Sequence, residues 1–154
     1  MGLSVEISDN VIISCPREEV WRGLNDLIVL RNCIPGCEEL HEDDDGKLGA
    51  VVTTKVGPIK ARFKGTVELS DLNPPISYVI AGEGKGGAAG FASGMAKVKL
   101  EEHPEGTMLS YTVNVKIGGK LAQLGARLIK SVAKKLSAQF FESFSDAISS
   151  DTAT

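Results

Sequence analysis

The sequence has no long apolar run, and this absence limits the classes of protein that it can encode. No stretch approaches the roughly 18 consecutive apolar residues that a membrane-spanning helix needs. The N-terminus also lacks the cationic segment followed by an apolar core that marks a secretory signal. We therefore expect a protein of the cytoplasm.

Cysteine is scarce, and acidic residues outnumber basic ones. The 3 cysteines are an odd number in a chain without an export signal, so we expect free thiols rather than a disulfide framework. Cys33, Cys37 and His41 recur every four residues, but Pro35-Gly36 interrupts them and no fourth ligand lies near, so no metal site is predicted. The net charge of −3, with no nucleic-acid motif, argues against a nucleic-acid partner.

The sequence does contain regular alternation of apolar and polar residues, which predicts antiparallel strands. Ile59–Leu69 is the clearest case, and Leu109–Ile117 repeats the pattern. Each strand then buries one face and exposes the other. With an opening strand at Leu3–Ser14, and with turn signals between the later segments, about seven strands result.

Helical signals flank these strands. Two short helices are predicted after the first strand, one beginning near Pro16 and one running from Leu27 to about Cys33. A long helix, about 40 Å in length, is predicted from Ala122 to Ile148 because apolar residues recur there every three or four positions. The fold class is α+β, a seven-stranded curved antiparallel sheet around the long C-terminal helix. We expect a single domain over residues 1–148 and a frayed tail over residues 149–154.

Five segments carry a resemblance to a known family. They are Val20-Trp21, Ile34–Leu40, Lys55–Lys60, Gly82–Gly87 and Gly119–Gly125. Together they resemble the carbon monoxide dehydrogenase G-subunit family, which lies in the polyketide cyclase and START-like (SRPBCC) superfamily of helix-grip proteins.

The resemblance implies a helix-grip domain that holds a lipophile between the sheet and the long helix. It also implies an accessory protein, not a catalytic component, of a molybdenum hydroxylase of the carbon monoxide dehydrogenase type. Such members are thought to help that enzyme reach the membrane or its quinone pool, which would place the protein transiently at the inner face of the cell membrane. Many members carry a C-terminal anchor, and none follows the predicted helix here, so a soluble shuttle is expected.

Small residues at inward positions of the predicted sheet indicate a pocket. Ala61, Gly65, Ala92, Gly94 and Ala96 cannot fill the volume that a strongly curved sheet encloses. We expect a lipophilic small molecule, with a quinone as the specific candidate, to occupy that volume, and we expect tyrosine hydroxyls to bond its carbonyl oxygen. The same residues are also compatible with an ordinary core. The predicted ligand-binding residues are Phe63, Val67, Tyr78, Ile80, Phe91, Tyr111, Val113, Leu124, Leu128 and Phe140.

Enzyme chemistry has weaker support in the sequence. Gly82, Gly84 and Gly87 match the spacing of a dinucleotide-binding loop, but a predicted strand follows them where a helix is needed to receive the phosphate. We therefore assign no catalytic residue, no metal and no resident cofactor. The alternative hypothesis of a cyclase or hydrolase relies on three ionisable side chains, Tyr78, Tyr111 and His41.

Basic residues alternate onto the outer, solvent-exposed face of the predicted sheet. Such a face can dock an acidic partner or anionic lipid head groups. Lysines on an exposed sheet also prevent edge pairing, so the two interpretations stay open. A third hypothesis follows, in which the chain is an assembly or membrane-recruitment chaperone for the enzyme and binds no ligand. The predicted docking residues are Lys60, Arg62, Lys64, Lys97 and Lys99.

Overall fold

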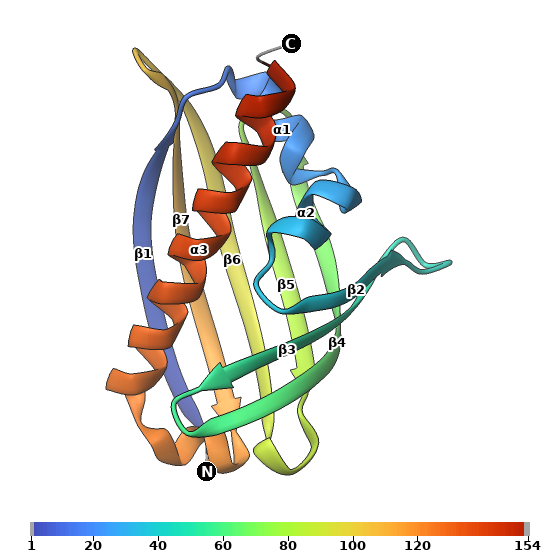
Figure 1. The fold of residues 1–154 in the computed structure, drawn as a ribbon, viewed down its shortest axis with the longest axis vertical. Helices are drawn as coiled ribbons and strands as arrows, with labels where there is room; N and C mark the ends of the chain where they lie inside the picture. Colours follow the sequence, from blue (N-terminus) through green and yellow to red (C-terminus); the bar gives the residue numbers. More distant parts are fainter. Residues whose placement is uncertain (1, 153–154) are drawn as a thin grey trace.

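The structure, a computed structural model, describes the backbone of residues 2–152. Within this range seven strands form one antiparallel sheet in the order β1-β7-β6-β5-β4-β3-β2 (Figure 1). The elements are β1 (Leu3–Ile13), α1 (Arg17–Leu24), α2 (Leu27–Cys33), β2 (Cys37–Glu42), β3 (Leu48–Val56), β4 (Ile59–Asn73), β5 (Ser77–Lys85), η1 (Gly87–Ala89), β6 (Phe91–His103), β7 (Gly106–Gly118), η2 (Gly119–Leu124) and α3 (Ala126–Thr152).

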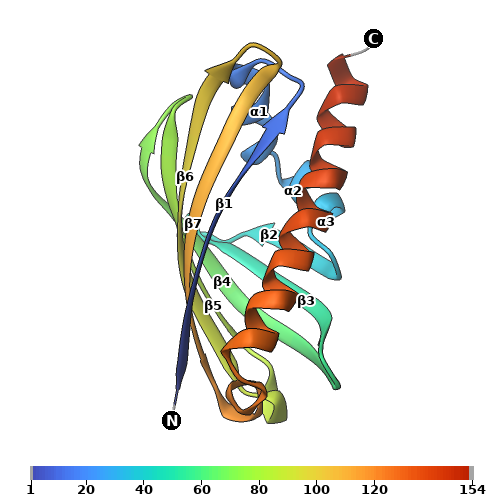
Figure 2. The ribbon, with the colours of Figure 1, turned by 90° about the vertical axis from the view of Figure 1, so that its left-hand side faces the viewer.

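The sheet curves and presents one face, here called the inner face, to α3. Figure 2 shows α3 standing along this face, with α1 and α2 beside its C-terminal half. α3 packs on β1 and on α2, so the helix rests on one sheet edge and one short helix. The predicted α+β class is confirmed, with its seven-stranded antiparallel sheet, its two short helices after the first strand and its long C-terminal helix.

The short helices begin and end where local chemistry allows. α1 starts after Pro16, whose extended backbone precedes the first helical residue. Asp26 caps α2, because its Oδ1 accepts hydrogen bonds from the backbone N–H groups of Ile28 at 2.9 Å and Val29 at 3.3 Å. Asn25 closes α1 instead, donating from Nδ2 to the carbonyl of Trp21 at 2.9 Å.

The long helix differs from its prediction at both ends. The predicted start at Ala122 lies in η2, a 3-10 helix, and α3 begins only after Gly125, whose φ of +88° cannot continue an α-helix. At the other end α3 continues to Thr152, four residues beyond the predicted stop at Ile148. Residues 153–154 of the predicted frayed tail lie outside the described residues. No helix within residues 2–152 has both the length and the apolar character that crossing a bilayer requires.

The buried apolar residues form two separate clusters at opposite ends of the inner face. The upper cluster joins β1, β6 and β7 to the short helices and to the C-terminal half of α3, and its fully buried members include Ile13, Leu100, Leu109 and Phe144. The lower cluster joins the start of β1, the β3–β4 end and η2 to the first turn of α3, and it includes Val5, Val56, Ala61, Ile117, Leu121 and Ile129. The middle of the inner face lies between them.

Candidate functional site

The middle of the inner face is covered by residues with little or no side chain. Strand pairing sets Gly65 of β4 opposite Gly84 of β5, and Gly82 of β5 opposite Gly94 of β6. Ala92 of β6 extends the first of these two rows, because it pairs with Gly84. Three adjacent strands therefore offer a nearly flat floor, and this floor leaves space on the inner face of the sheet that strand residues alone line, among the described residues.

This space is a pocket of about 380 Å³, a volume within the usual range for small-molecule sites. None of its inward-facing lining residues has an ionisable side chain. Glu83 also borders the pocket, but strand alternation turns its exposed side chain to the outer face. The inward-facing lining residues are Ala50, Val52, Phe63, Gly65, Val67, Ile80, Gly82, Gly84, Ala92, Gly94, Ala96, Val113 and Val115.

Phe63 forms one wall of the pocket, and a glycine makes room for its ring. A Cβ atom placed on Gly86 would lie 2.8 Å from Phe63 Cε1, so a larger residue there would push the ring aside. A Cβ atom placed on Gly84 would meet Phe63 Cβ at 3.7 Å, which is an ordinary contact. The floor at Gly84 is therefore open towards the pocket. The space beside Gly86, in contrast, is filled by the Phe63 ring.

Larger hollows lie on the outer face of the sheet and have a different character. One of about 520 Å³ includes Lys47, Glu68 and Lys116 in its lining, and another of about 670 Å³ includes Asp43 and Lys64. Charged side chains on an exposed face suit water better than an apolar ligand. The inner pocket is therefore the candidate site for a lipophile.

The structure brings only some of the predicted ligand-binding residues together. Phe63, Val67, Ile80 and Val113 line the pocket. The lining also contains residues that are not among the predicted ligand-binding residues, and two of them, Gly82 and Gly84, belong to the glycine motif whose nucleotide-loop interpretation the sequence argues against. Their spacing of two within a strand is the signal that places both on one face. The other unselected inward residues are Ala50, Val52 and Val115.

Four further predicted residues do not line the pocket. Tyr78 and Phe140 lie in the upper cluster, and Leu124 packs on the lower cluster. Leu128 covers the β3–β4 turn, since a Cβ atom on Gly57 would lie 2.8 Å from Leu128 Cδ2. Their predicted role in ligand binding remains a prediction.

The expectation that Phe91 points inward is wrong. Its side chain is 53% exposed, and it pairs with Lys85 and Gly118 on the outer face. The next residue, Ala92, is the one that faces the pocket. Because side chains alternate along a strand, a choice that is one residue off selects the opposite face.

The two tyrosines lie outside the pocket lining and have raised pKa values. Burial raises the pKa of Tyr78, whose ring meets Trp21 edge-to-face with centroids 5.2 Å apart. Burial also raises the pKa of Tyr111, as does nearby Asp9, while a hydrogen bond with Ser137 lowers it. Tyrosines with raised pKa values stay in the neutral phenol form at neutral pH, so neither can act as a base there.

His41, the third residue of the enzyme hypothesis, lies on the outer face. Its ring covers Gly49, and its Nε2 is 3.2 Å from Asp43 Oδ1 with 60% of the side chain exposed. Within the described residues no group of three or more His, Cys, Asp or Glu side chains is placed to hold a metal ion. Gly87 opens η1, and β6 follows it, so the predicted strand after the glycine motif is confirmed.

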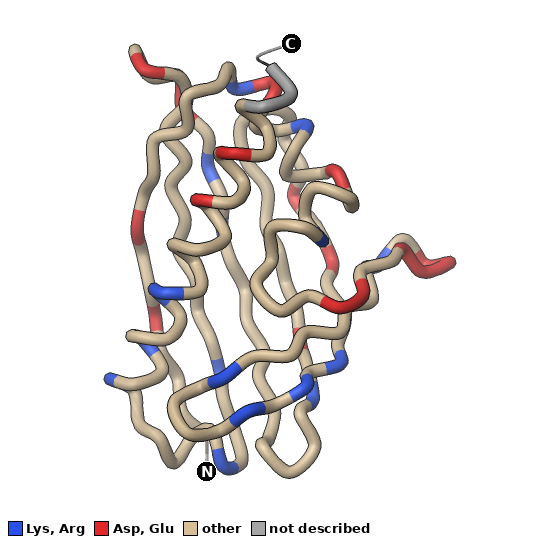
Figure 3. Tube along the Cα trace, in the orientation of Figure 1, with Lys and Arg blue, Asp and Glu red and all other residues tan. Residues whose placement is uncertain are grey.

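The predicted docking residues are all exposed on the outer face, but they do not form one wall. Lys60, Arg62 and Lys64 lie on β4, whereas Lys97 lies at the middle of β6 and Lys99 in its second half. Figure 3 shows basic residues at both ends of the molecule. The expectation of a single cationic wall across the sheet is therefore wrong.

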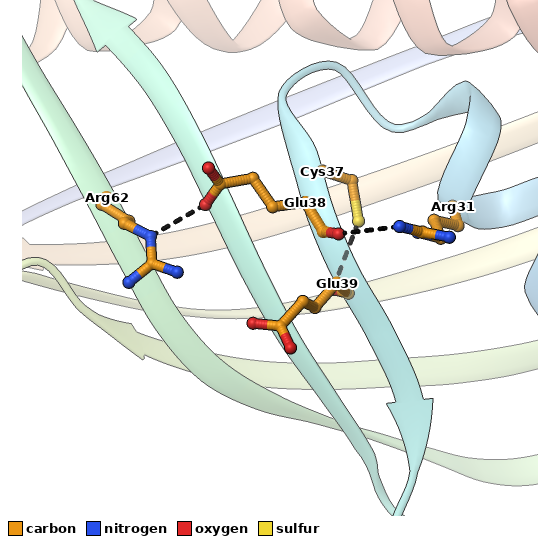
Figure 4. A network of polar contacts seen from close by, with 5 residues as sticks. All are labelled: Arg31, Cys37, Glu38, Glu39 and Arg62. Carbon is orange, nitrogen blue, oxygen red and sulfur yellow. Dashed lines mark hydrogen bonds and ion pairs between the residues drawn. The ribbon is translucent and has the colours of Figure 1, made fainter.

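Arg62 is also engaged with the neighbouring edge of the sheet. Its Nε donates to Glu38 Oε2 at 2.8 Å, and this contact lowers the pKa of Glu38 (Figure 4). Arg31 of α2 donates to the backbone carbonyl of Glu38 at 3.1 Å, and Cys37 Sγ donates to the carbonyl of Glu39 at 3.4 Å. These contacts fix the start of β2 between α2 and β4.

Comparison with known proteins gives a family and several related folds. The family model for the G component of carbon monoxide dehydrogenase (CoxG) matches residues 10–149. A conserved protein from Geobacillus kaustophilus is 31% identical, with 96% of each chain covered and a TM-score of 0.86. No curated protein matches the chain.

Two more distant structures share the fold. Ara h 8.0201 is 14% identical with a TM-score of 0.64, and the alignment covers 96% of this chain and 99% of that one. The ZhuI aromatase/cyclase from Streptomyces sp. R1128 is 13% identical with a TM-score of 0.62, and the alignment covers 97% and 94%. At such identities the likeness concerns architecture alone.

Proposed function

The chain belongs to the carbon monoxide dehydrogenase G-subunit family (CoxG), and from this membership we propose that it is a non-catalytic carrier of a lipophilic small molecule. The observation that carries the proposal is the pocket between the two core clusters. Its volume is about 380 Å³, and its inward-facing residues are glycine and apolar side chains. Such a pocket gains affinity by removing apolar surface from water.

The lining selects for an uncharged ligand. Because no inward-facing lining residue is ionisable, a charged group would lose its hydration without gaining a partner. A quinone is our specific candidate, since its ring is flat and uncharged and can lie against the glycine floor. Tyr78 and Tyr111 lie outside the lining, so the affinity is expected to come from burial more than from hydrogen bonds.

The family supports an accessory role beside a larger enzyme. We propose that this enzyme is a molybdenum hydroxylase of the carbon monoxide dehydrogenase type and that the carrier serves it in the cytoplasm. The ionisable residues of the enzyme hypothesis lie outside the pocket lining, which favours the carrier over a cyclase or hydrolase.

Ligand extraction followed by rebinding tests the proposal. Solvent extracts of the purified protein, analysed by mass spectrometry, should contain a neutral lipophile. After delipidation, decylubiquinone at about 100 times its Kd should raise the thermal midpoint by roughly 5–10 °C for a chain of this size.

The other two hypotheses make different forecasts. A chaperone that needs no ligand would co-purify with the dehydrogenase while its extract and thermal midpoint show no quinone effect. An enzyme would change the added compound chemically, which the same mass spectra would reveal. Either result, in the absence of ligand uptake, would end the carrier proposal.

A further inference from the structure

The two edges of the sheet differ in how well they are protected against pairing with another strand. β2, at one edge, has only 6 residues, three of them glutamates, and a register shift interrupts its pairing with β3 near Cys37. Short length, charge and irregular pairing are the usual means by which natural proteins protect a sheet edge. β2 therefore carries the expected protection.

β1, at the opposite edge, lacks most of this protection. It has 11 residues, and it contains neither proline nor lysine; its charged residues are Glu6 and Asp9. Its pairing with β7 runs from Leu3 to Ile13 without a register shift, and within residues 2–152 β7 is its only neighbour in the sheet. Figure 2 views the molecule from this side and shows β1 in front of the other strands, with α3 to one side. Since strands of about five or six residues are typical, β1 presents an unusually long and regular edge.

One hydrogen bond shows which backbone groups of β1 point outward from the sheet. The N–H of Asn10 donates to Oδ1 of Asp9 at 2.8 Å, so it points away from β7. Backbone groups alternate in direction along an antiparallel strand, so the residues at even positions of β1 turn their N–H and C=O groups outward. These residues are Ser4, Glu6, Ser8, Asn10 and Ile12. A further strand at this edge would bond to them.

We propose that β1 pairs with β1 of a second copy of this chain, in an antiparallel ladder centred on Ser8. This register pairs the whole strand, because Leu3 then lies opposite Ile13 and Val5 opposite Val11. A twofold axis through Ser8 makes the interface isologous, so each of these pairs occurs twice. The two seven-stranded sheets join into one continuous sheet. The inference does not require that the pocket binds a ligand.

Charge favours the same register over its neighbours. With the axis at Ser8, Glu6 lies opposite Asn10 and Asp9 lies opposite Ile7, so no two charges of the same sign meet. An axis at Glu6 or at Asp9 would set that acid opposite its own copy, and like charges directly opposite one another are destabilising. An axis at Ile7 avoids this repulsion but leaves the last two residues of β1 unpaired. This complementarity of the strand to itself favours a second copy over a different partner.

Sedimentation velocity tests the dimer, and substitutions near the axis test its register. The wild-type chain should form a species of twice the monomer mass, in a fraction that rises with concentration. Ser8→Lys sets two positive charges opposite each other and should abolish this species. Asn10→Lys faces Glu6 of the second copy at two places and should tighten the dimer roughly two- to thirtyfold, whereas Asn10→Glu should weaken it by a similar factor. An axis at Ile7 would make neither change at position 10 meet Glu6.

Thr112 supplies the matched control, because it lies beside Ser8 on β7, one strand in from the edge. Ser8 Oγ donates to Thr112 Oγ1 at 3.1 Å, so Ser8→Lys and Thr112→Lys lose the same hydrogen bond and gain the same charge. Thr112→Lys should dimerise like the wild type. Equal loss of the dimer in both variants, or a dimer that Ser8→Lys leaves intact, would overturn the proposal.

Cross-linking gives a direct readout of the axis. Cα atoms of a hydrogen-bonded antiparallel pair lie about 5.5 Å apart, which is within the range that a disulfide spans. Ser8→Cys should therefore cross-link two chains when copper phenanthroline oxidises the thiols, and Thr112→Cys should not. A wild-type chain that stays monomeric up to about 1 mM, with no cross-link in Ser8→Cys, would overturn the dimer and leave the edge to a strand of another protein. Decylubiquinone uptake by Ser8→Lys should equal that of the wild type, so it reports on the carrier function separately.

Discussion

Filling the pocket at Gly84 separates ligand binding from folding stability. A Cβ atom at this position meets Phe63 Cβ at 3.7 Å and the Lys64 carbonyl oxygen at 3.9 Å, so alanine enters without a clash. At Gly65, by contrast, a Cβ atom would lie 1.9 Å from the Glu83 carbonyl oxygen, and the backbone would have to move. Gly84 is therefore the floor position where added volume goes into the pocket.

The two effects of Gly84→Ala have opposite signs. The free energy of unfolding should rise by roughly 0.5–1 kcal/mol, because glycine within a strand costs about that much relative to alanine. Ligand affinity should fall about tenfold, since one methyl group of misfit in an apolar pocket is worth roughly 1–3 kcal/mol. Gly84→Leu adds three more carbon atoms and should abolish binding.

Isothermal titration of the delipidated protein with decylubiquinone measures the affinity, and urea denaturation measures the stability. Ala81→Leu is the matched control, since Ala81 lies on the same strand but faces the outer hollow. It should leave the affinity unchanged. Equal affinity in the wild type, Gly84→Ala and Gly84→Leu would refute the reasoning, because the ligand could not then lie on the glycine floor.

Three further predictions concern stability. Phe144 is fully buried in the upper cluster, so Phe144→Ala should lower the free energy of unfolding by about 3–5 kcal/mol in urea titrations; a loss below about 1 kcal/mol would contradict its place in the core. Thr107 donates from Oγ1 to the buried Cys15 carbonyl at 2.7 Å, and Thr107→Val should cost about 1–3 kcal/mol, measured the same way. Burial raises the pKa of Tyr78, so the folded state favours the neutral form and stability should fall as the pH rises above about 10. Tyr78→Phe should weaken this alkaline loss of stability. An unchanged pH profile in the variant would show that Tyr78 does not cause the loss.

The sequence predicted the sheet and the helices well because their periodicities are strong. In β4 and β7 apolar and polar residues alternate over several residue pairs. In α3 the apolar residues recur every three or four positions over more than two turns. Patterns of this length identify the element even where single residues depart from them. The start of α3 could not be placed in the same way. Apolar spacing continues through η2 into α3, and only the backbone conformation of Gly125 divides them.

The sequence predicted an apolar pocket on the inner face, but it predicted only some of the residues that line this pocket. Small inward residues on β4 and β6 indicated a hollow, and Gly65, Ala92, Gly94 and Ala96 do line it. The pattern gives the face on which each residue lies. It does not give the position of that residue along the sheet relative to the pocket. Tyr78 has the correct face but lies within the upper cluster, because pairing registers decide how far each strand extends past its neighbours.

The division of the core into two clusters has a consequence for how the protein responds to occupancy. The two ends are linked through the sheet and along α3, so each end can loosen with some independence of the other. A guest held on the glycine floor would touch both regions and couple their fluctuations. Amide hydrogens on β5 and β6 would then exchange with solvent as one cooperative unit, and the loaded and unloaded forms would differ in rigidity more than in shape.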